Sequence, residues 1–487
     1  MKRVLALMAV LIIAAVGIFC AVGATVNAKK DQVVITENIM YGDKSSAEGI
    51  IIENQSRYGR HLFWNTKYTS GESAYSKTEF IFSETEIRRS NPRRKNGNIL
   101  ETDIAYGCDF KIPAEEQQGI ARVYKELYDS AKPGEELKKV ISLKDYYEYY
   151  PIGIAIDLPD ISWNVFSEEY HVWQSEENDY KHAWRVFNEF FKIPVPENIK
   201  VELSISKGDK SSVSIGVGSS YVGGDDFYLS TLSTYSDNKC FFTIDNRTRS
   251  GNIIDTSLIP GGYGIYAFSY GREAEKYETK VDADSLQMVY ALDEEAAVCH
   301  LSMNHDKTKL LLFLKNGEKL YMSVIDSASM AELQNFSFGE GDIYEVYEYG
   351  AGWGNYDKEE DRSFIVLYLS ESRICVIEMN EAGEYEHKFT VDAANVVNPE
   401  FGYWSSPAFN FDGERLAMVD YMYIGPYVNI PSCGYYMAVY TKDGLMYYAE
   451  YESSLSVHPN TDLYEKNCLP ADDNRKETFK VRFSKEE

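Results

Sequence analysis

Local motifs of catalysis and of nucleotide binding are missing from this chain of 487 residues. It contains no GxSxG, HExxH, Walker A or GxGxxG pattern, so neither a nucleophile elbow nor a phosphate-binding loop is predicted. The nearest glycine-rich run, GVGSSYVGGDD at residues 216–226, lacks the third glycine spacing and the lysine, and we interpret it as a flexible hairpin. The sequence therefore predicts no cofactor.

Cysteine is scarce, with seven in the chain, and no CxxC pair occurs. This excludes a sequence-local zinc site and a thioredoxin-type motif, and the density is too low for a disulfide scaffold. Cys240, Cys299 and Cys375 lie in apolar, strand-like runs, so they are expected to be free thiols, the last two of them buried and unpaired. Cys433 and Cys468 lie in loop-like sequence and are candidates for a disulfide.

Basic residues are also few, because 49 Lys and Arg stand against 76 Asp and Glu, for a formal charge of −27. Binding to nucleic acid needs clustered positive charge, and so does docking on an anionic membrane surface. The excess of acidic residues therefore argues against both functions. The single basic run, residues 88–98, is interpreted as a solvated surface loop. The acidity itself is explained by solubility.

The seven histidines do not form a recognisable metal site. His300 and His305 are close in sequence but fall across a strand end and a turn, and two histidines need a third ligand to hold zinc. Two acidic clusters, Asp357–Asp361 and Asp472–Asn474, offer oxygen ligands but lack the spacing of a calcium loop. We therefore expect structural histidines, solvated acids and no metal. Paired acids of a glycosidase cannot be identified among so many carboxylates.

One pattern matches a catalytic motif. Ser204 and Lys207 stand in an SxxK arrangement, and Ser236–Asn238 reads SDN, as in penicillin-binding enzymes. However, Ser204 lies in the alternating run KVELSISK, which predicts a strand, and no KTG follows. Side chains three apart on a strand point to opposite faces, so the lysine is not expected to activate the serine.

The N-terminus predicts the compartment. Lys2 and Arg3 precede an uncharged run from Val4 to Val26, and small residues lie at Val26 and Ala28. This fits a secretory signal over residues 1–28, but about 20 apolar residues also suffice to span a bilayer, so a signal anchor fits equally. In either case residues 29–487 are expected outside the cytoplasm, secreted or tethered, with membrane contact only through residues 1–28 if these stay uncleaved.

The second half of the chain contains a repeat. Asn304, Asn355 and Asn410 each begin an Asn-x-Asp step, 51 and 55 residues apart, and apolar strand-like runs follow each step. The unit has about four short strands, and a period in this range is typical of propeller blades, because sheets that pack face to face around an axis bury both faces. We predict three consecutive four-stranded antiparallel sheets over residues 297–451.

The third unit, SSPAFNFDGERLAMVD at residues 405–420, resembles the repeat of TolB-type and WD40-like propellers, with its Ser-Pro, Asp-Gly turn and short apolar strand. The first unit lacks the Ser-Pro and the glycine, and a charged insert interrupts the second. The resemblance implies a fold and no site residues.

The first half is less regular. Residues 182–193 are the best helix candidate, because apolar residues recur at three and four, whereas residues 119–143 fit either a helix or a hairpin that turns at Pro133-Gly134, with the hairpin favoured. The fold class expected is all-β and propeller-like, with about seven blades (six to eight), and a C-terminal strand, ETFKVRF, that completes the first. Residues 29–487 form one such domain, or residues 29–200 form a separate β-rich domain before a propeller at 201–487.

The function expected is that of a non-enzymatic propeller-like binding or accessory protein at the cell envelope, with an unidentified protein, peptide or glycan as its ligand. The alternative is an envelope glycoside hydrolase or lyase on the same scaffold, which requires two carboxylates about 5–10 Å apart in an aromatic-lined pocket.

Overall fold

The computed structural model divides into two compact units, which are described separately. The middle unit is Arg93–Asp342, and the terminal unit combines Met1–Pro92 with Ile343–Glu487. The described residues are 2–29, 34–58, 62–82, 100–102, 110–111, 113–117, 119–158, 161–165, 171–172, 180–208, 215–223, 229, 231–236, 238–248, 250–273, 278–349, 363–393, 407–423, 431–453 and 478–484.

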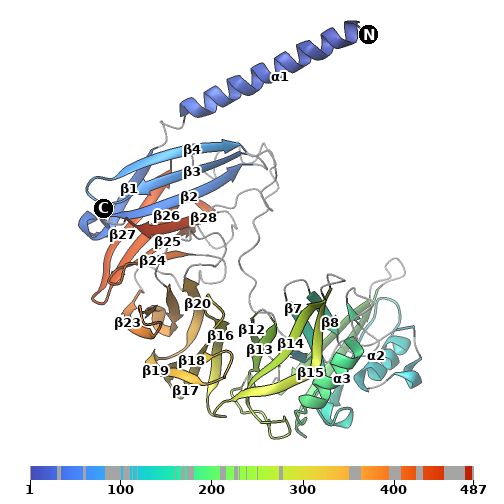
Figure 1. Cartoon of the computed structure of the whole chain (residues 1–487). Coiled ribbons are helices and arrows are strands. Elements are labelled where there is room, and N and C mark those ends of the chain that lie inside the picture. The colour runs from blue at the N-terminus through green and yellow to red at the C-terminus, as the bar shows by residue number, and fades with distance from the viewer. Residues whose placement is uncertain are drawn as a thin grey trace. The chain divides into compact units, whose positions relative to one another are not determined.

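The described residues of the terminal unit form three antiparallel sheets (Figure 1). Each is a run of strands adjacent in sequence, extended in two cases by a strand from the other end of the chain. The orders are β20 (Ile343–Tyr349), β21 (Ser363–Leu369), β22 (Arg373–Met379), β23 (Tyr385–Asp392); then β24 (Ala408–Phe411), β25 (Leu416–Tyr423), β26 (Pro431–Thr441), β27 (Gly444–Ser453), β1 (Ile35–Gly42); then β28 (Thr478–Phe483), β2 (Ile50–Tyr58), β3 (Leu62–Thr69), β4 (Tyr75–Phe82).

The middle unit contains three further four-stranded sheets and one three-stranded sheet. The four-stranded orders are β5 (Leu100–Thr102), β7 (Ile152–Leu158), β8 (Ile161–Val165), β9 (His171–Val172); then β12 (Thr231–Tyr235), β13 (Lys239–Ile244), β14 (Gly264–Glu273), β15 (Glu278–Ala291); then β16 (Ala297–Met303), β17 (Lys309–Asn316), β18 (Lys319–Asp326), β19 (Glu332–Glu340). The three-stranded order is β11 (Ile215–Val222), β10 (Lys200–Lys207), β6 (Glu136–Ser142).

The described residues thus form an all-β, propeller-like chain with six blade-like sheets, inside the predicted range. The three sheets predicted over residues 297–451 are confirmed as β16–β19, β20–β23 and β24–β27, with β1 added to the last. The three-stranded sheet is not a meander, because β6 lies between β5 and β7 in the sequence but pairs with β10.

Two of the three Asn-x-Asp steps shape the turn between the first two strands of a sheet, as predicted, and the step at Asn355 lies outside the described residues. The Asn304 side chain accepts a hydrogen bond from the backbone N–H of Lys309 at 2.8 Å, in the turn from β16 to β17. In the turn from β24 to β25, the Asp412 carboxylate accepts from the backbone N–H groups of Glu414 and Arg415 at 3.0 and 2.7 Å. These side-chain bonds replace backbone partners and fix the tight reversal.

The C-terminal strand completes the sheet that begins with β2, as the sequence predicted. β28 pairs with β2 along its length, with Val481 opposite Ile52, and Figure 1 shows β28 in red beside β2 in blue. Val481 is 4% exposed and packs into a core shared with Ala417 and Val439 of the neighbouring sheet. This sheet therefore joins a strand from near the C-terminus to three strands from the first hundred residues of the chain.

Two α-helices lie among the described residues of the middle unit. Residues 182–193 were expected to be helical, and α3 spans Tyr180–Phe190, so that prediction is confirmed. The hairpin favoured for residues 119–143 was wrong in its first half, because α2 spans Gly119–Ser130 and only Glu136–Ser142 is a strand. Ile120, Val123 and Tyr124 recur at helical spacing and are buried, and the Pro-Gly turn joins the helix to β6 rather than two strands.

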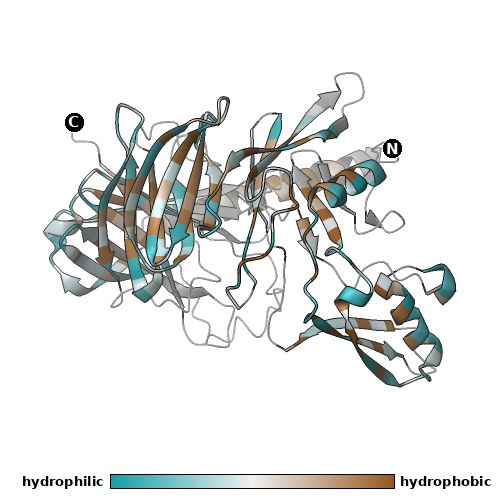
Figure 2. Ribbon diagram, turned by 90° about the horizontal axis from the view of Figure 1, so that it is seen from below, coloured by the Kyte–Doolittle hydropathy of each residue, from teal (hydrophilic) through white to brown (hydrophobic). Residues whose placement is uncertain are grey.

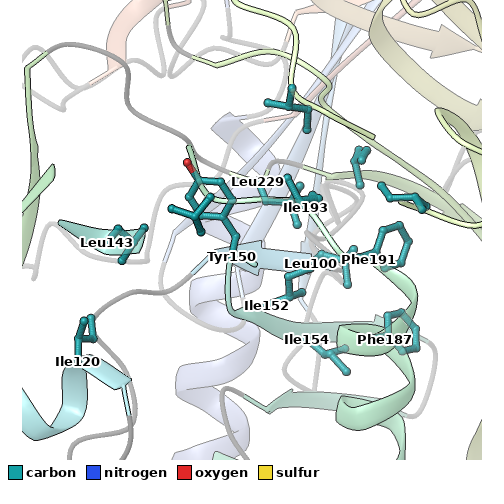
Figure 3. Close-up of a cluster of buried hydrophobic side chains, with 14 of the residues drawn as sticks. Leu100, Ile120, Leu143, Tyr150, Ile152, Ile154, Phe187, Phe191, Ile193 and Leu229 are labelled. Atoms are coloured by element: carbon teal, nitrogen blue, oxygen red, sulfur yellow. The ribbon is translucent and has the colours of Figure 1, made fainter. Parts of the chain in front are cut away.

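The middle unit's larger core combines sheet and helix residues. Figure 3 shows this cluster, with Phe187 of α3 and Phe191, which directly follows α3, beside Leu100 and Ile154 of the sheet that contains β5 and β7. In Figure 2 the strands show brown apolar segments, whereas the turns that join them are mostly teal. Alternation along the strands therefore buries one face, which the helices and the neighbouring sheets cover.

The N-terminal helix α1 spans Lys2–Lys29, and its described apolar side chains are exposed, from 54% for Met8 to 72% for Ile13. Within the part of the chain that the structure describes, no helix has both the length and the apolar character that crossing a membrane requires.

The predictions for the three strand cysteines are confirmed except for the burial of Cys299. Cys240, Cys299 and Cys375 are unpaired, and Cys240 and Cys375 are buried. Cys299 is only half-buried, so the expectation that it is buried was wrong; it lies near the start of β16, where the sheet opens to solvent. Cys433 and Cys468, the candidate disulfide, lie outside the residues whose side chains are described.

Candidate functional site

The SxxK serine and lysine do not meet. Both lie on β10, whose alternation buries Val201, Leu203 and Ile205 and leaves Ser204 on the opposite face, as predicted. The Lys207 ammonium donates to the carbonyls of Tyr128 and Ala131 at 3.3 Å, where it caps the C-terminal end of α2, and it stands 4.1 Å from the Tyr128 ring centre. The lysine is committed to the helix end and is not available as a base.

We therefore predict no acylation of Ser204 by a β-lactam probe, because a serine nucleophile needs a base within about 3 Å of its hydroxyl. Intact-mass spectrometry of the full chain after incubation with the probe gives the result, and Ser204→Ala supplies the unlabelled reference. Stoichiometric labelling of Ser204 that disappears in Lys207→Ala would contradict the prediction.

The other residues singled out in the sequence stay apart. Ser236 and Asn238 lie in the turn from β12 to β13, where the Ser236 hydroxyl donates to the Lys239 carbonyl at 3.4 Å. His300 stacks edge-on against Phe313 within its own sheet, and His305 lies in the exposed turn that follows β16. Among the described residues no group of His, Cys, Asp and Glu has the geometry of a metal site.

Several sequence candidates fall outside the described residues. These are the acidic clusters Asp357–Asp361 and Asp472–Asn474, the basic run at residues 88–98, the middle residue of the SDN triplet and residues 224–226 of the glycine-rich run. The described part of that run lies in the single strand β11, which pairs with β10, and the flexible hairpin expected over residues 216–226 stays a prediction.

Polar side chains instead gather at one end of two neighbouring sheets in the middle unit. Asp245 follows β13 directly, Cys299 lies near the start of β16, Lys315 lies near the end of β17, and Asp342 follows β19. The Lys315 ammonium lies 2.6 Å from a carboxylate oxygen of Asp342. The charges of Lys315, Asp342 and Asp245 all act on the Cys299 thiol, so the four groups lie within electrostatic range of one another. We name them the Cys299 cluster.

The loop that begins with Asp245 is fixed to the connection that leads from its own sheet to the next one. Asn246 donates to the Glu294 carbonyl at 2.7 Å, and the Arg247 guanidinium donates to the carbonyls of Glu295 at 2.7 Å and Gly251 at 3.3 Å. The loop from β13 to β14 is therefore tied to the turn from β15 to β16. Loops held on a rigid scaffold in this way are the usual place for binding residues.

The ionisation of the cluster follows from its surroundings. Burial raises the pKa of the Cys299 thiol to about 11; Lys315 opposes this shift, and Asp342 and Asp245 add to it. Burial also raises the pKa of Asp245, against the backbone N–H and the charge of Arg247. Asp245 as a whole residue is nevertheless exposed to solvent, and water screens its charge. The raised pKa of Asp245 therefore implies little change in the stability of the folded protein.

Chemically, the cluster is suited to recognition. The thiol stays protonated at neutral pH and is a weak nucleophile. Lys315 is paired with Asp342, and Arg247 is committed to backbone carbonyls. The cluster is therefore an ordered surface that presents acidic and basic side chains on short loops held in place by hydrogen bonds.

Little in the sequence indicated this cluster. Asp245, Cys299, Lys315 and Asp342 are spread over almost 100 residues, and none belongs to a motif. The only usable signal is the repeat itself, because strands of successive sheets that run in the same sense place their following residues at the same end.

No family model and no curated protein matches the chain. Solved structures similar to it include the periplasmic gluconolactonase of Pseudomonas aeruginosa, at 12% identity and a TM-score of 0.23, with 82% of each chain covered. An oligogalacturonate lyase from Vibrio parahaemolyticus is 10% identical over 86% of this chain and 97% of the lyase, with a TM-score of 0.26. The β-propeller domain of Swd1 from Myceliophteria thermophila is 8% identical over 50% of this chain and 81% of that domain, with a TM-score of 0.22. Likeness at this level assigns neither site residues nor an activity.

Proposed function

We propose that this chain is an extracytoplasmic, non-enzymatic binding or accessory protein of the cell envelope, delivered by residues 1–28, with a protein, peptide or glycan as its ligand. The observation that supports binding over catalysis is the Cys299 cluster, where Lys315 and Arg247 are engaged by partners within the protein and the thiol is protonated. Catalysis needs a nucleophile or base that is free to act.

The location is tested by protease accessibility of the full chain in intact cells whose outer layers have been made permeable. We expect the wild-type protein to be degraded by added protease, and the variant Leu11→Arg to be protected because a charge interrupts the apolar run that directs export. Asn27→Gln is the matched control and behaves as wild type. Wild-type protein that resists protease until the cells are lysed contradicts the proposed location.

One observation favours the alternative, an envelope glycoside hydrolase or lyase. The pKa of Asp245 is raised, and a carboxylic acid with a raised pKa is the group that such an enzyme uses as a general acid. Under the proposed function, purified protein releases no product from acidic or neutral oligosaccharides. Turnover that falls about 100-fold or more in Asp245→Asn would establish the alternative instead.

A further inference from the structure

The N-terminal strand β1 is held in an unusual way. It adds to the outer edge of β27, with Ile35 opposite Ser453 and Gly42 opposite Tyr447, and a bulge interrupts the pairing near Met40. Its residues are exposed except Ile35 and Glu37, which are intermediate. The strand therefore buries little apolar surface, and backbone pairing alone is a weak attachment in water.

Glu37 supplies the remaining contacts. One oxygen of its carboxylate accepts hydrogen bonds from the hydroxyls of Tyr447 at 2.6 Å and Tyr451 at 3.0 Å, and the other lies 2.5 Å from the Lys44 ammonium. Tyr68 of β3 packs edge-on against Tyr451, with 5.2 Å between the ring centres, and the charge of Glu37 acts on its hydroxyl. The Glu37 side chain is only 7% exposed. Glu37, Lys44, Tyr68, Tyr447 and Tyr451 form what we name the Glu37 clasp, and it joins β1 to two different sheets.

The ionisation states fit a clasp that depends on charge. Burial raises the pKa of Glu37, but the hydrogen bonds from Lys44, Tyr447 and Tyr451 together lower it by more than burial raises it. The net pKa of Glu37 therefore lies below its ordinary value of 4.5. Burial, aided by Glu37, raises the pKa of Tyr68 and Tyr447, so the phenols remain donors. Because the folded pKa of Glu37 is depressed, its stabilisation is present above pH 4.5 and is lost as the pH falls through the folded pKa.

We propose that residues 35–44 form a strap that releases from the edge of β27 when Glu37 loses its charge, while the remaining strands of the terminal unit stay folded. The groups that face Glu37 are Lys44 from the turn after β1, Tyr68 from β3, and Tyr447 and Tyr451 from β27, and Glu72 acts in turn on Lys44. The lysine stays charged and the phenols stay neutral throughout acidic and neutral pH, so Glu37 alone titrates within the clasp there.

Hydrogen exchange with mass spectrometry on the full chain tests the strap. At neutral pH, Glu37→Gln is expected to lower the protection of peptides from β1 about tenfold or more, while peptides from β25 and β26 keep theirs. In the wild type, the same selective loss appears as the pH falls below 4.5. Glu452→Gln, an exposed acid on β27, is the matched control and behaves as wild type.

A second variant keeps the test decisive if Glu37→Gln does not fold. Tyr447→Phe removes one donor but leaves the ring in the core, so release is expected at a higher pH than in the wild type, because one hydrogen bond that lowers the pKa of Glu37 is gone. The proposal is overturned if β1 keeps its protection at neutral pH in Glu37→Gln, if Tyr447→Phe releases β1 at the same pH as the wild type, or if the sheet of β20–β23 loses protection equally.

Discussion

Replacing Phe242 with alanine is expected to lower the free energy of unfolding of the middle unit by about 3–5 kcal/mol. Phe242 is fully buried, and its ring centre lies 5.6 to 6.3 Å from those of Tyr266, Phe191, Phe268 and Phe187. Truncation leaves a cavity between α3 and the sheet of β12–β15, where rigid rings cannot collapse to fill it.

Urea unfolding, followed by hydrogen exchange of peptides from β13 and β14, measures this change. Leu333→Ala is the control, because Leu333 is 50% exposed on β19 and its truncation is expected to change stability by about 0.5 kcal/mol or less. A loss below about 1 kcal/mol for Phe242→Ala would contradict the packing of α3 against this sheet.

Val481→Asp is expected to destabilise the terminal unit by about 4 kcal/mol or more. Val481 is 4% exposed, pairs with Ile52 and packs in the core between two sheets, so a carboxylate there has neither water nor a partner. The strand β28 would then leave the edge of β2 unpaired.

The matched control places the same charge three residues later, in Ser484→Asp, where the side chain is exposed. Urea unfolding of both variants, followed by hydrogen exchange of peptides from β2, separates the effect of burial from that of charge. Equal stability of the two variants would mean that the C-terminal segment does not complete this sheet.

Local patterns in the sequence predicted most of the sheet structure. The apolar runs, the Asn-x-Asp turns and the C-terminal ETFKVRF segment each encode their strand or turn within a few residues, through alternation and Asx hydrogen bonding. The prediction at α2 was wrong because two local signals conflict there. The spacing of Ile120, Val123 and Tyr124 favours a helix, whereas the Pro-Gly turn favours a hairpin, although such a turn also follows helices.

The two polar clusters could not be predicted, because both depend on pairing between distant parts of the chain. Glu37 and Tyr447 are 410 residues apart and meet only because β1 adds to β27. Lys315 and Asp342 carry no motif, and their contact depends on how β17 and β19 end. The half-buried state of Cys299 has the same origin, since an apolar run does not show where its sheet opens to solvent.

The most direct test of the proposed function is to incubate the purified full chain with glycan and peptide arrays. Mass spectrometry then identifies the ligands that the protein retains. The account predicts that a ligand class is retained reproducibly and is recovered chemically intact after prolonged incubation. Recovery of a cleaved ligand, with product that accumulates in proportion to protein and time, would contradict it and show that the protein is an enzyme.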